Sequence, residues 1–249
     1  MITTVLFDMG GTLEDIWVDE KTHHEAIARL DEMLAGWGLE TGCTREELLR
    51  AVDEGWKRYD VVRKRGDVEL KPEAIWCDYI LEPFHFPREV LSAHAEEIAH
   101  MWEVTYYHRE LRKGAKDMLH ALKDMGLKLG VISNTAAMYQ VFDSLEEYGI
   151  RDVFTDVTLS SVTGLRKPCR DIFTVSLREM QSLAAESVYV GDTVSRDVIG
   201  SKKAGFACAI QITSRLTREK DQAVAKAPEA DYVITDIRDV EGIVRKLIS

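Results

Sequence analysis

The sequence predicts an α/β fold, a doubly wound parallel sheet with helices on both faces, joined to a second, all-helical region. Two observations predict it. From residue 110 onwards, short apolar runs alternate with amphipathic helical segments, the pattern of a parallel sheet with helical crossovers. Between residues 19 and 109 only helical periodicity occurs. We therefore expect a core domain of residues 1–18 and 110–249, and an inserted helical domain of residues 19–109.

The first predicted strand covers residues 3–9, TTVLFDM, a run rich in β-branched and aromatic residues. It is closed by Gly10 and Gly11, which predict a tight turn. Asp8 therefore lies at the carboxyl end of a buried strand. The two glycines could turn backbone N–H groups toward an anion, although an aspartate before such a turn is often purely structural.

The helical insert carries recognisable helix starts. Residues 25–38 place apolar side chains on one face, and Thr44 and Glu47 have the spacing of a capping box. Pro72 and Pro87 each fit the first turn of a further helix. Most of the tryptophans fall in this region, where packing inside a helix bundle explains them best.

After the insert, strands and helices alternate to the end of the chain. The predicted helices cover residues 114–126, 137–149, 171–180, 194–205 and 240–248. The predicted strands cover residues 127–134, 152–161, 187–192, 206–212 and 230–235. Because ligands of parallel sheets bind beyond the carboxyl ends of the strands, the polar residues there are the candidates for function.

Composition and charge exclude several classes of function. The 249 residues are 45% hydrophobic, enough for a sizeable core. The formal charge is −11, from 32 Lys and Arg against 43 Asp and Glu. This charge repels a nucleic-acid backbone and an anionic membrane surface, so we expect neither as a partner.

Cysteine usage and the chain start favour the cytoplasm. Cys43, Cys77, Cys169 and Cys208 lie far apart and form no CxxC pair, which argues against a zinc site or a disulfide framework. The start MITTVLFD does not resemble a signal peptide, and no apolar run reaches the length of a membrane span. We therefore expect a reducing compartment.

Four groups of polar residues could carry chemistry. Ser133 and Asn134 end a strand and could donate hydrogen bonds to phosphate. Lys167, before a proline, could offset negative charge on a reacting phosphoryl group. Asp192 and Asp197 offer the hard oxygen donors that Mg²⁺ prefers. Each residue taken singly also has a structural explanation, as a helix cap, a surface cation or a turn residue.

The order of these groups resembles the haloacid dehalogenase-like hydrolase superfamily, specifically its Mg²⁺-dependent phosphatases. DMGGTL resembles the nucleophile loop, SNT the second signature, RKP the third and GDTVSRD the fourth. The helical insert between the first two is similar to the α-helical cap of that family. The resemblance covers nearly the whole chain.

The resemblance implies a role for each matching residue. Asp8 would attack phosphorus and form an aspartyl-phosphate, with Lys167 keeping it ionised. Mg²⁺ would be held by Asp8, the carbonyl of Gly10 and Asp192, with Asp197 close by. The residues that would bind the phosphoryl group of a small phosphorylated substrate are Gly11, Ser133, Asn134 and Lys167, while Thr12 would support the loop.

The sequence departs from the family pattern at Gly10, where phosphatases carry a second aspartate that acts as general acid and base. Its loss is expected to cost about 10²–10⁴ in rate. Another group could replace it, or a good leaving group could make it unnecessary. The nearby candidates are Glu14, Asp15, Asp19, His23 and His24.

Two alternatives to a phosphatase follow from the gap at Gly10. A non-catalytic phosphate-binding or interaction protein could keep this fold, although the retained Asp8, Lys167 and Asp192 argue against full loss of activity. A 2-haloacid dehalogenase also lacks the second aspartate, but it works without metal and without the acidic fourth signature present here. The sequence identifies neither the substrate nor whether the chain is a monomer or a homodimer.

Overall fold

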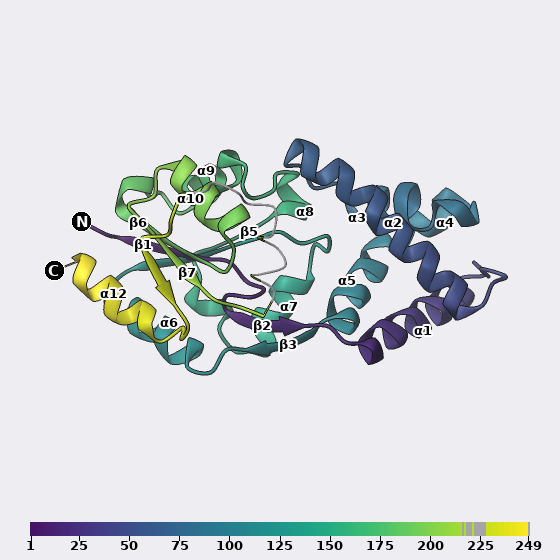
Figure 1. Cartoon of the computed structure of the whole chain (residues 1–249), viewed down its shortest axis with the longest axis horizontal. Helices are drawn as coiled ribbons and strands as arrows, with labels where there is room; N and C mark the ends of the chain where they lie inside the picture. Colours follow the sequence, from purple (N-terminus) through teal and green to yellow (C-terminus); the bar gives the residue numbers. More distant parts are fainter. Residues whose placement is uncertain (216, 218–220, 222–227, 249) are drawn as a thin grey trace.

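The computed structural model describes residues 1–215, 217, 221 and 228–248. Its centre is a six-stranded sheet with the order β5-β4-β1-β6-β7-β8, in which every neighbouring pair is parallel (Figure 1). The predicted α/β fold is confirmed. The strands are β1 (Thr4–Phe7), β4 (Lys128–Ser133), β5 (Asp156–Leu159), β6 (Ser187–Gly191), β7 (Cys208–Ile212) and β8 (Tyr232–Ile234).

Helices cover both faces of this sheet because side chains alternate along each strand. On β1, Val5 and Phe7 join a core cluster with side chains of α6 (Ala115–Asp124), α7 (Gln140–Glu147) and α12 (Asp239–Ile248). Leu6, between them, packs into a second cluster with α9 (Arg170–Glu179). Figure 1 shows α9 and α10 (Ile199–Ala204) on the opposite side of the sheet from α6 and α12.

The strand order fixes where a ligand would bind. β1 lies in the middle, with β4 hydrogen-bonded on one side and β6 on the other. The chain leaves β1 toward β4 and β5, and later returns to the other side of β1 to form β6, β7 and β8. The carboxyl ends of β1 and β6 therefore meet at the point where the winding reverses, the usual ligand site of such sheets.

The inserted region is a helical cap, which lies at the right-hand end of the molecule in Figure 1. Its helices are α1 (Glu20–Gly36), α2 (Arg45–Gly66), α3 (Pro72–Ile75), α4 (Arg88–Ala93) and α5 (Ala95–Tyr106), with a π-helical turn at Trp76–Ile80 and a 3₁₀ turn at Glu82–Phe84. The Thr44–Glu47 capping box is present. Pro72 opens α3 as predicted, whereas Pro87 stands just before α4 rather than inside its first turn.

The tryptophans form the centre of the cap. The rings of Trp76 and Trp102 meet edge to face with centroids 5.7 Å apart, and Trp56 lies 6.0 Å from Trp76. α2 approaches the π-helical turn so closely at Gly55 that a Cβ there would lie 2.5 Å from the Cα of Ile80. The bundle-core explanation of these tryptophans is therefore confirmed. Within the part of the chain that the structure describes, no helix is both long and apolar enough to cross a bilayer.

Cap and core are joined by a two-stranded antiparallel sheet that the sequence did not predict. β2 (Glu14–Trp17) pairs with β3 (His108–Leu111). His108 and Arg109, assigned to the helical insert, are therefore strand residues. Both strands are four residues long and mostly polar, so neither shows the pattern of a buried strand, and their pairing depends on a contact across the whole insert.

Smaller differences occur where the chain turns. Residues 152–161, predicted as one strand, contain β5 flanked by a 3₁₀ turn at Arg151–Val153 and by α8 (Ser160–Thr163). Residues 194–205 begin with a π-helical turn at Val194–Val198 before α10. A further 3₁₀ turn covers Ala184–Glu186.

Candidate active site

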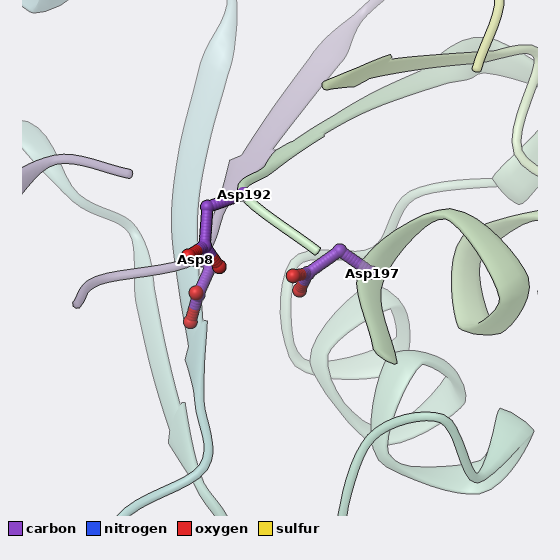
Figure 2. Close-up of side chains that lie close together, drawn as sticks. All are labelled: Asp8, Asp192 and Asp197. Carbon is purple, nitrogen blue, oxygen red and sulfur yellow. The ribbon is translucent and has the colours of Figure 1, made fainter. Parts of the chain in front are cut away.

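Three aspartates converge at the carboxyl edge of the sheet. Asp8 directly follows β1, Asp192 follows β6, and Asp197 lies in the π-helical turn Val194–Val198. One carboxylate oxygen from each lies within 4.8 Å of the other two, and the residues are 7%, 0% and 2% exposed. Figure 2 shows Asp197 reaching from its turn toward Asp8 and Asp192 at the strand ends. We call these three residues the carboxylate cluster.

Gly11 makes room for the carboxylate cluster. A Cβ at this position would lie 2.3 Å from Oδ2 of Asp192, closer than any real contact, and the φ of Gly11 is +95°. Both facts require glycine here. The Gly11 N–H donates to the carbonyl of Glu14 (3.0 Å), and Thr12 N–H donates to the Met9 carbonyl (3.1 Å), so these N–H groups help to close the loop.

Lys167 is the cation of the site. Its Nζ lies 2.7 Å from Oδ1 of Asp8 and 2.7 Å from Oδ1 of Asp197, and it donates to the hydroxyl of Tyr189 (2.9 Å). The residue is only 3% exposed. A buried ammonium between two carboxylates interacts strongly with both, because little water screens the charges.

Asn134 fixes the backbone of Lys167. Its Oδ1 accepts from the Lys167 N–H (2.9 Å) and its Nδ2 donates to the Lys167 carbonyl (3.0 Å). The amide thus has a structural role that the sequence prediction did not include. Ser133, the last residue of β4, is 5% exposed and precedes Asn134 directly, so both predicted phosphate-binding segments meet here.

The pKa values of two of these carboxylates shift in opposite directions, because nearby charges and hydrogen bonds outweigh burial at only one of them. Burial raises the pKa of Asp8 to about 6; Lys167 opposes this, while Asp197 and Asp192 add to it. Burial also acts to raise the pKa of Asp197, but the charges of Lys167 and Arg196 and hydrogen bonds to its carboxylate outweigh it and lower the pKa to about 2. Asp197 is therefore the firmly ionised member of the pair.

Hydrogen bonds hold two of the carboxylates in place. Oδ2 of Asp197 accepts from the N–H (3.0 Å) and the hydroxyl (2.6 Å) of Thr193. Oδ2 of Asp192 accepts from the hydroxyl of Ser214 (2.7 Å), which follows β7. The sequence reasoning missed Tyr189, Thr193 and Ser214, because hydroxyl groups in strands and turns carry no signal before their partners are known.

The carboxylate cluster fits a divalent cation such as Mg²⁺. Its donors are carboxylate oxygens, the hard ligands that this ion prefers. Lys167 lies within hydrogen-bonding distance of two of the three carboxylates, and the charge of Arg196 acts on all three. Among the described side chains of the site, the three carboxylates therefore outnumber these two cations. A cation bound there would offset this repulsion.

A different group of residues surrounds Gly10. A Cβ built on it would lie 3.1 Å from Cδ1 of Ile16, 3.8 Å from Nη1 of Arg109 and 4.0 Å from Oε2 of Glu14. Arg109 Nη1 donates to this same Glu14 oxygen (2.7 Å), and the Tyr148 hydroxyl donates to Oε1 (3.0 Å). We call Gly10, Glu14, Arg109 and Tyr148 the Gly10 corner. A buried ion pair thus lies where a second aspartate would project.

Each charged group of the Gly10 corner has a partner of opposite sign. Glu14 is fully buried, and Arg109 also forms an ion pair with Glu103. Burial acts to lower the pKa of Arg109, but Glu14 and Glu103 outweigh it and raise the pKa. Arg109 was not a predicted site residue; its only sequence signal was its place at the end of the insert.

The other candidates for the missing acid have different partners. Asp15 pairs with Arg215 (3.0 Å). Asp19 caps α1 and lies 2.9 Å from His108. The remaining two are His23, stacked on Tyr106 with ring centroids 4.5 Å apart, and His24, 3.9 Å from Glu20 on the surface of α1.

The chain is similar to known proteins over nearly its full length. It is 30% identical to the glyceraldehyde 3-phosphate phosphatase of Methanopyrus kandleri, over 99% of each chain. The structure of a 2-haloacid dehalogenase from Pseudomonas syringae pv. Tomato superposes with a TM-score of 0.71 at 21% identity, over 99% of this chain and 100% of the other. The magnesium-bound HAD-hydrolase YfnB of Bacillus subtilis gives 0.56 at 18% identity, over 98% of each.

A family model assigns the chain to a protein family more firmly than these single relatives do. Residues 2–205 match the model of haloacid dehalogenase-like hydrolases. The matched segment includes the whole carboxylate cluster, Lys167 and the helical cap. The chain is therefore an enzyme of the haloacid dehalogenase-like hydrolase family, a phosphatase-type member with an α-helical cap.

Proposed function

We propose that this enzyme is a Mg²⁺-dependent phosphatase that acts on a small phosphorylated molecule through an aspartyl-phosphate on Asp8. The observation that carries the proposal is the position of Asp8, whose carboxylate lies 2.7 Å from Lys167 Nζ and shares one small volume with Asp192 and Asp197. A carboxylate paired with a lysine beside a cation site is suited to attack phosphorus.

Asp8, Lys167 and Ser133 would each have a separate part in the reaction. A carboxylate oxygen of Asp8 forms the bond to phosphorus while the bond from phosphorus to the leaving oxygen breaks. Lys167, assisted by the hydroxyl of Ser133, binds the phosphoryl oxygens. Water then hydrolyses the aspartyl-phosphate, which releases inorganic phosphate and restores the Asp8 carboxylate.

Mg²⁺, when bound, would supply positive charge beside the transferring group. Asp8 and Asp192 would hold it together with the carbonyl of Gly10. Asp197 would stand beside the direct ligands, because its two oxygens already accept from Lys167, Tyr189 and Thr193. Its part is then to orient Lys167 and the turn after β6.

We propose a small phosphosugar as the substrate class. The relative from Methanopyrus kandleri, which matches over 99% of both chains, is a glyceraldehyde 3-phosphate phosphatase. A short sugar phosphate also suits a site whose Asp8, Ser133 and Lys167 are each at most 7% exposed. We further propose that the enzyme works as a monomer or homodimer in the cytoplasm, where its four free cysteines stay reduced.

The leaving group is expected to depart without a proton from the Gly10 corner. Both oxygens of Glu14 accept hydrogen bonds, one from the Arg109 guanidinium. Both oxygens of Glu14 are therefore occupied by partners other than a leaving group. Phosphate esters whose leaving groups are already stable as anions, such as aryl and acyl phosphates, should therefore react faster than alkyl phosphates.

The test is hydrolysis of p-nitrophenyl phosphate and of glyceraldehyde 3-phosphate by the wild type and by Asp8→Asn. We expect activity that requires Mg²⁺, is lost on chelation, and falls at least about 10³-fold in the variant. Asp78→Asn, which alters an exposed carboxylate of the cap paired with Arg88, serves as control. Unchanged activity in Asp8→Asn would refute the proposal.

The ion pair that fills the Gly10 corner favours one second candidate, a phosphate-binding protein without turnover. Such a protein would form a stable fluoroberyllate adduct on Asp8 in the presence of Mg²⁺ and yet hydrolyse none of these esters. Adduct formation together with turnover would exclude it.

A further inference from the structure

The cap touches the core at a second place, beside the segment that leads to Lys167. Directly after α2, residues 67–69 run alongside residues 164–166, and Val68 forms an antiparallel bridge with Leu165. We call residues 67–69 the cap strap. Two backbone hydrogen bonds flank the bridge, from the Glu69 N–H to the Gly164 carbonyl (3.0 Å) and from the Arg166 N–H to the Asp67 carbonyl (2.8 Å).

Glu69 of the cap strap sends its carboxylate into the core. It is 4% exposed. One oxygen accepts from the hydroxyl of Tyr59, within the cap. The other accepts from Nη1 of Arg166 and from the hydroxyl of Ser160 (2.9 Å), both in the core. The Glu69 carboxylate of the cap therefore accepts hydrogen bonds from a buried guanidinium and a buried hydroxyl of the core.

The two core partners of Glu69, Arg166 and Ser160, are each linked to residues that we propose bind phosphate. Arg166 immediately precedes Lys167 in the chain. The hydroxyl of Ser160 accepts from the N–H of Thr135 (2.9 Å), and Thr135 follows Asn134, whose side chain holds the Lys167 backbone on both sides. Glu69 is thus linked to both segments that frame the phosphate site.

We propose that Glu69 is a positioning residue that holds Lys167 in its phosphate-binding place through Arg166 and Ser160. This inference rests on the proposed function, because it presupposes that Lys167 binds phosphate. The phosphate site is then complete only while this edge of the cap is docked. Without Glu69, Arg166 becomes a buried guanidinium without its carboxylate partner, directly before Lys167 in the chain.

The electrostatics around Arg166 support this dependence. Burial, together with the charges of Arg63 and Arg196, lowers the pKa of Arg166 to about 9. Its charged form is therefore costly in this place and needs a carboxylate nearby. Removing one partner of a buried ion pair is far more disruptive than removing both.

The experiment compares Glu69→Gln with Glu96→Gln. Glu96, on α5, is a matched control, since it also joins cap to core by accepting from the N–H groups of Met138 and Tyr139 (2.8–3.0 Å). The probe is inorganic phosphate with Mg²⁺, measured as inhibition of p-nitrophenyl phosphate hydrolysis and by calorimetry. Melting temperatures are recorded for all variants.

We expect Glu69→Gln to weaken phosphate binding about tenfold or more, because a small displacement of a binding group has such effects. Glu96→Gln should lower the melting temperature with less than about a twofold change in phosphate binding. Arg166→Met should also weaken binding, and the double variant with Glu69→Gln should be no worse than either single variant, as expected when two residues act through one path.

Other outcomes contradict either the positioning role of Glu69 or the proposed function. If Glu69→Gln binds phosphate like Glu96→Gln, its contacts only stabilise the fold. If Glu69→Gln does not fold, Ser160→Ala decides: it should weaken phosphate binding about threefold, and unchanged binding refutes the positioning role. A wild type that binds no phosphate, or an Asp8→Asn variant with full activity, contradicts the proposed function instead.

Discussion

The carboxylate cluster and the Gly10 corner lie on either side of the same loop but differ in charge balance. In the carboxylate cluster three carboxylates outnumber the two cations that act on them, Lys167 and Arg196, and burial raises the pKa of Asp8 to about 6. In the Gly10 corner, Glu14 and Arg109 neutralise each other. The first region gains from a bound cation and a phosphoryl group. In the second region the charged groups already have partners of opposite sign.

This difference separates two parts of phosphatase chemistry. The groups that we propose attack and stabilise phosphorus, Asp8 and Lys167, are present and contact each other. The side chain that would move a proton to the leaving oxygen is absent at Gly10, and the Glu14–Arg109 ion pair lies in its place. The chain should therefore keep phosphoryl transfer while losing general acid catalysis, and four experiments can break or sharpen this contrast.

The largest effect is expected from Lys167→Met, which removes the cation of the carboxylate cluster. Activity should fall about 10²–10³-fold, the usual cost of losing one electrostatic stabiliser. The acid limb of the pH–activity profile should move to higher pH, because Lys167 lowers the pKa of Asp8. Lys202→Met, which breaks an ion pair with Asp231 away from the site, is the control. An unshifted acid limb would contradict this assignment.

Gly10→Asp restores the missing group and should raise the rate on alkyl phosphates about tenfold or more. The φ of Gly10 permits a side chain. The new Cβ would displace the end of the Ile16 side chain, 3.1 Å away, and the carboxylate beyond it would project toward Arg109 and Glu14. The dependence of rate on leaving-group pKa should become shallower. Gly10→Asn controls for size; an equal gain in Gly10→Asn would exclude proton transfer as the cause.

Mg²⁺ affinity should depend on pH through Asp8. The metal needs the ionised carboxylate, so affinity should be constant above pH 6 and fall about tenfold per unit below it, given the pKa of about 6. Asp197, with a pKa of about 2, stays ionised throughout. Calorimetry between pH 5 and 8 measures this, and Asp8→Asn should show no such slope. A flat profile in the wild type would remove Asp8 from the ligands.

The smallest effect on rate is expected from Glu14→Gln. The change removes the fully buried carboxylate of an ion pair whose guanidinium keeps Glu103 as a second partner, so it should cost about 1–3 kcal/mol of unfolding free energy. The rate constant of the folded protein should change less than about threefold, because Glu14 is not the acid. Denaturant unfolding and kinetics on alkyl phosphates provide the two readouts. A selective loss on alkyl phosphates would show that Glu14 does donate a proton.

The sequence predicted most of the sheet and of the site for one physical reason. Parallel strands end at a common edge, so Asp8, Ser133 and Asp192, each at the end of an apolar run, had to come together. Lys167 does not follow a strand. As a cation before a proline it was one candidate among polar residues that each also had a structural explanation, and the family resemblance singled it out. The structure places its ammonium between Asp8 and Asp197.

Contacts between the cap and the core were not predictable in the same way. Glu69 and Arg166 are 97 residues apart, and each would be read in isolation as a surface charge. Glu14 was a candidate acid on the sequence, but its neutralisation depends on Arg109, 95 residues away. Pairs of this kind are set by how the domains meet, which no local pattern contains.

The β2–β3 pair has a consequence for how the cap could be exchanged. Trp17 and His108 face each other in the ladder, so the insert leaves and re-enters the core at adjacent points. A tight hairpin turn joining these two residues would close the chain without changing the strand register. The cap is thus an exchangeable unit on a common base. A different set of helices grafted there, with a carboxylate kept at the place of Glu69, could give the same phosphorus chemistry a new specificity.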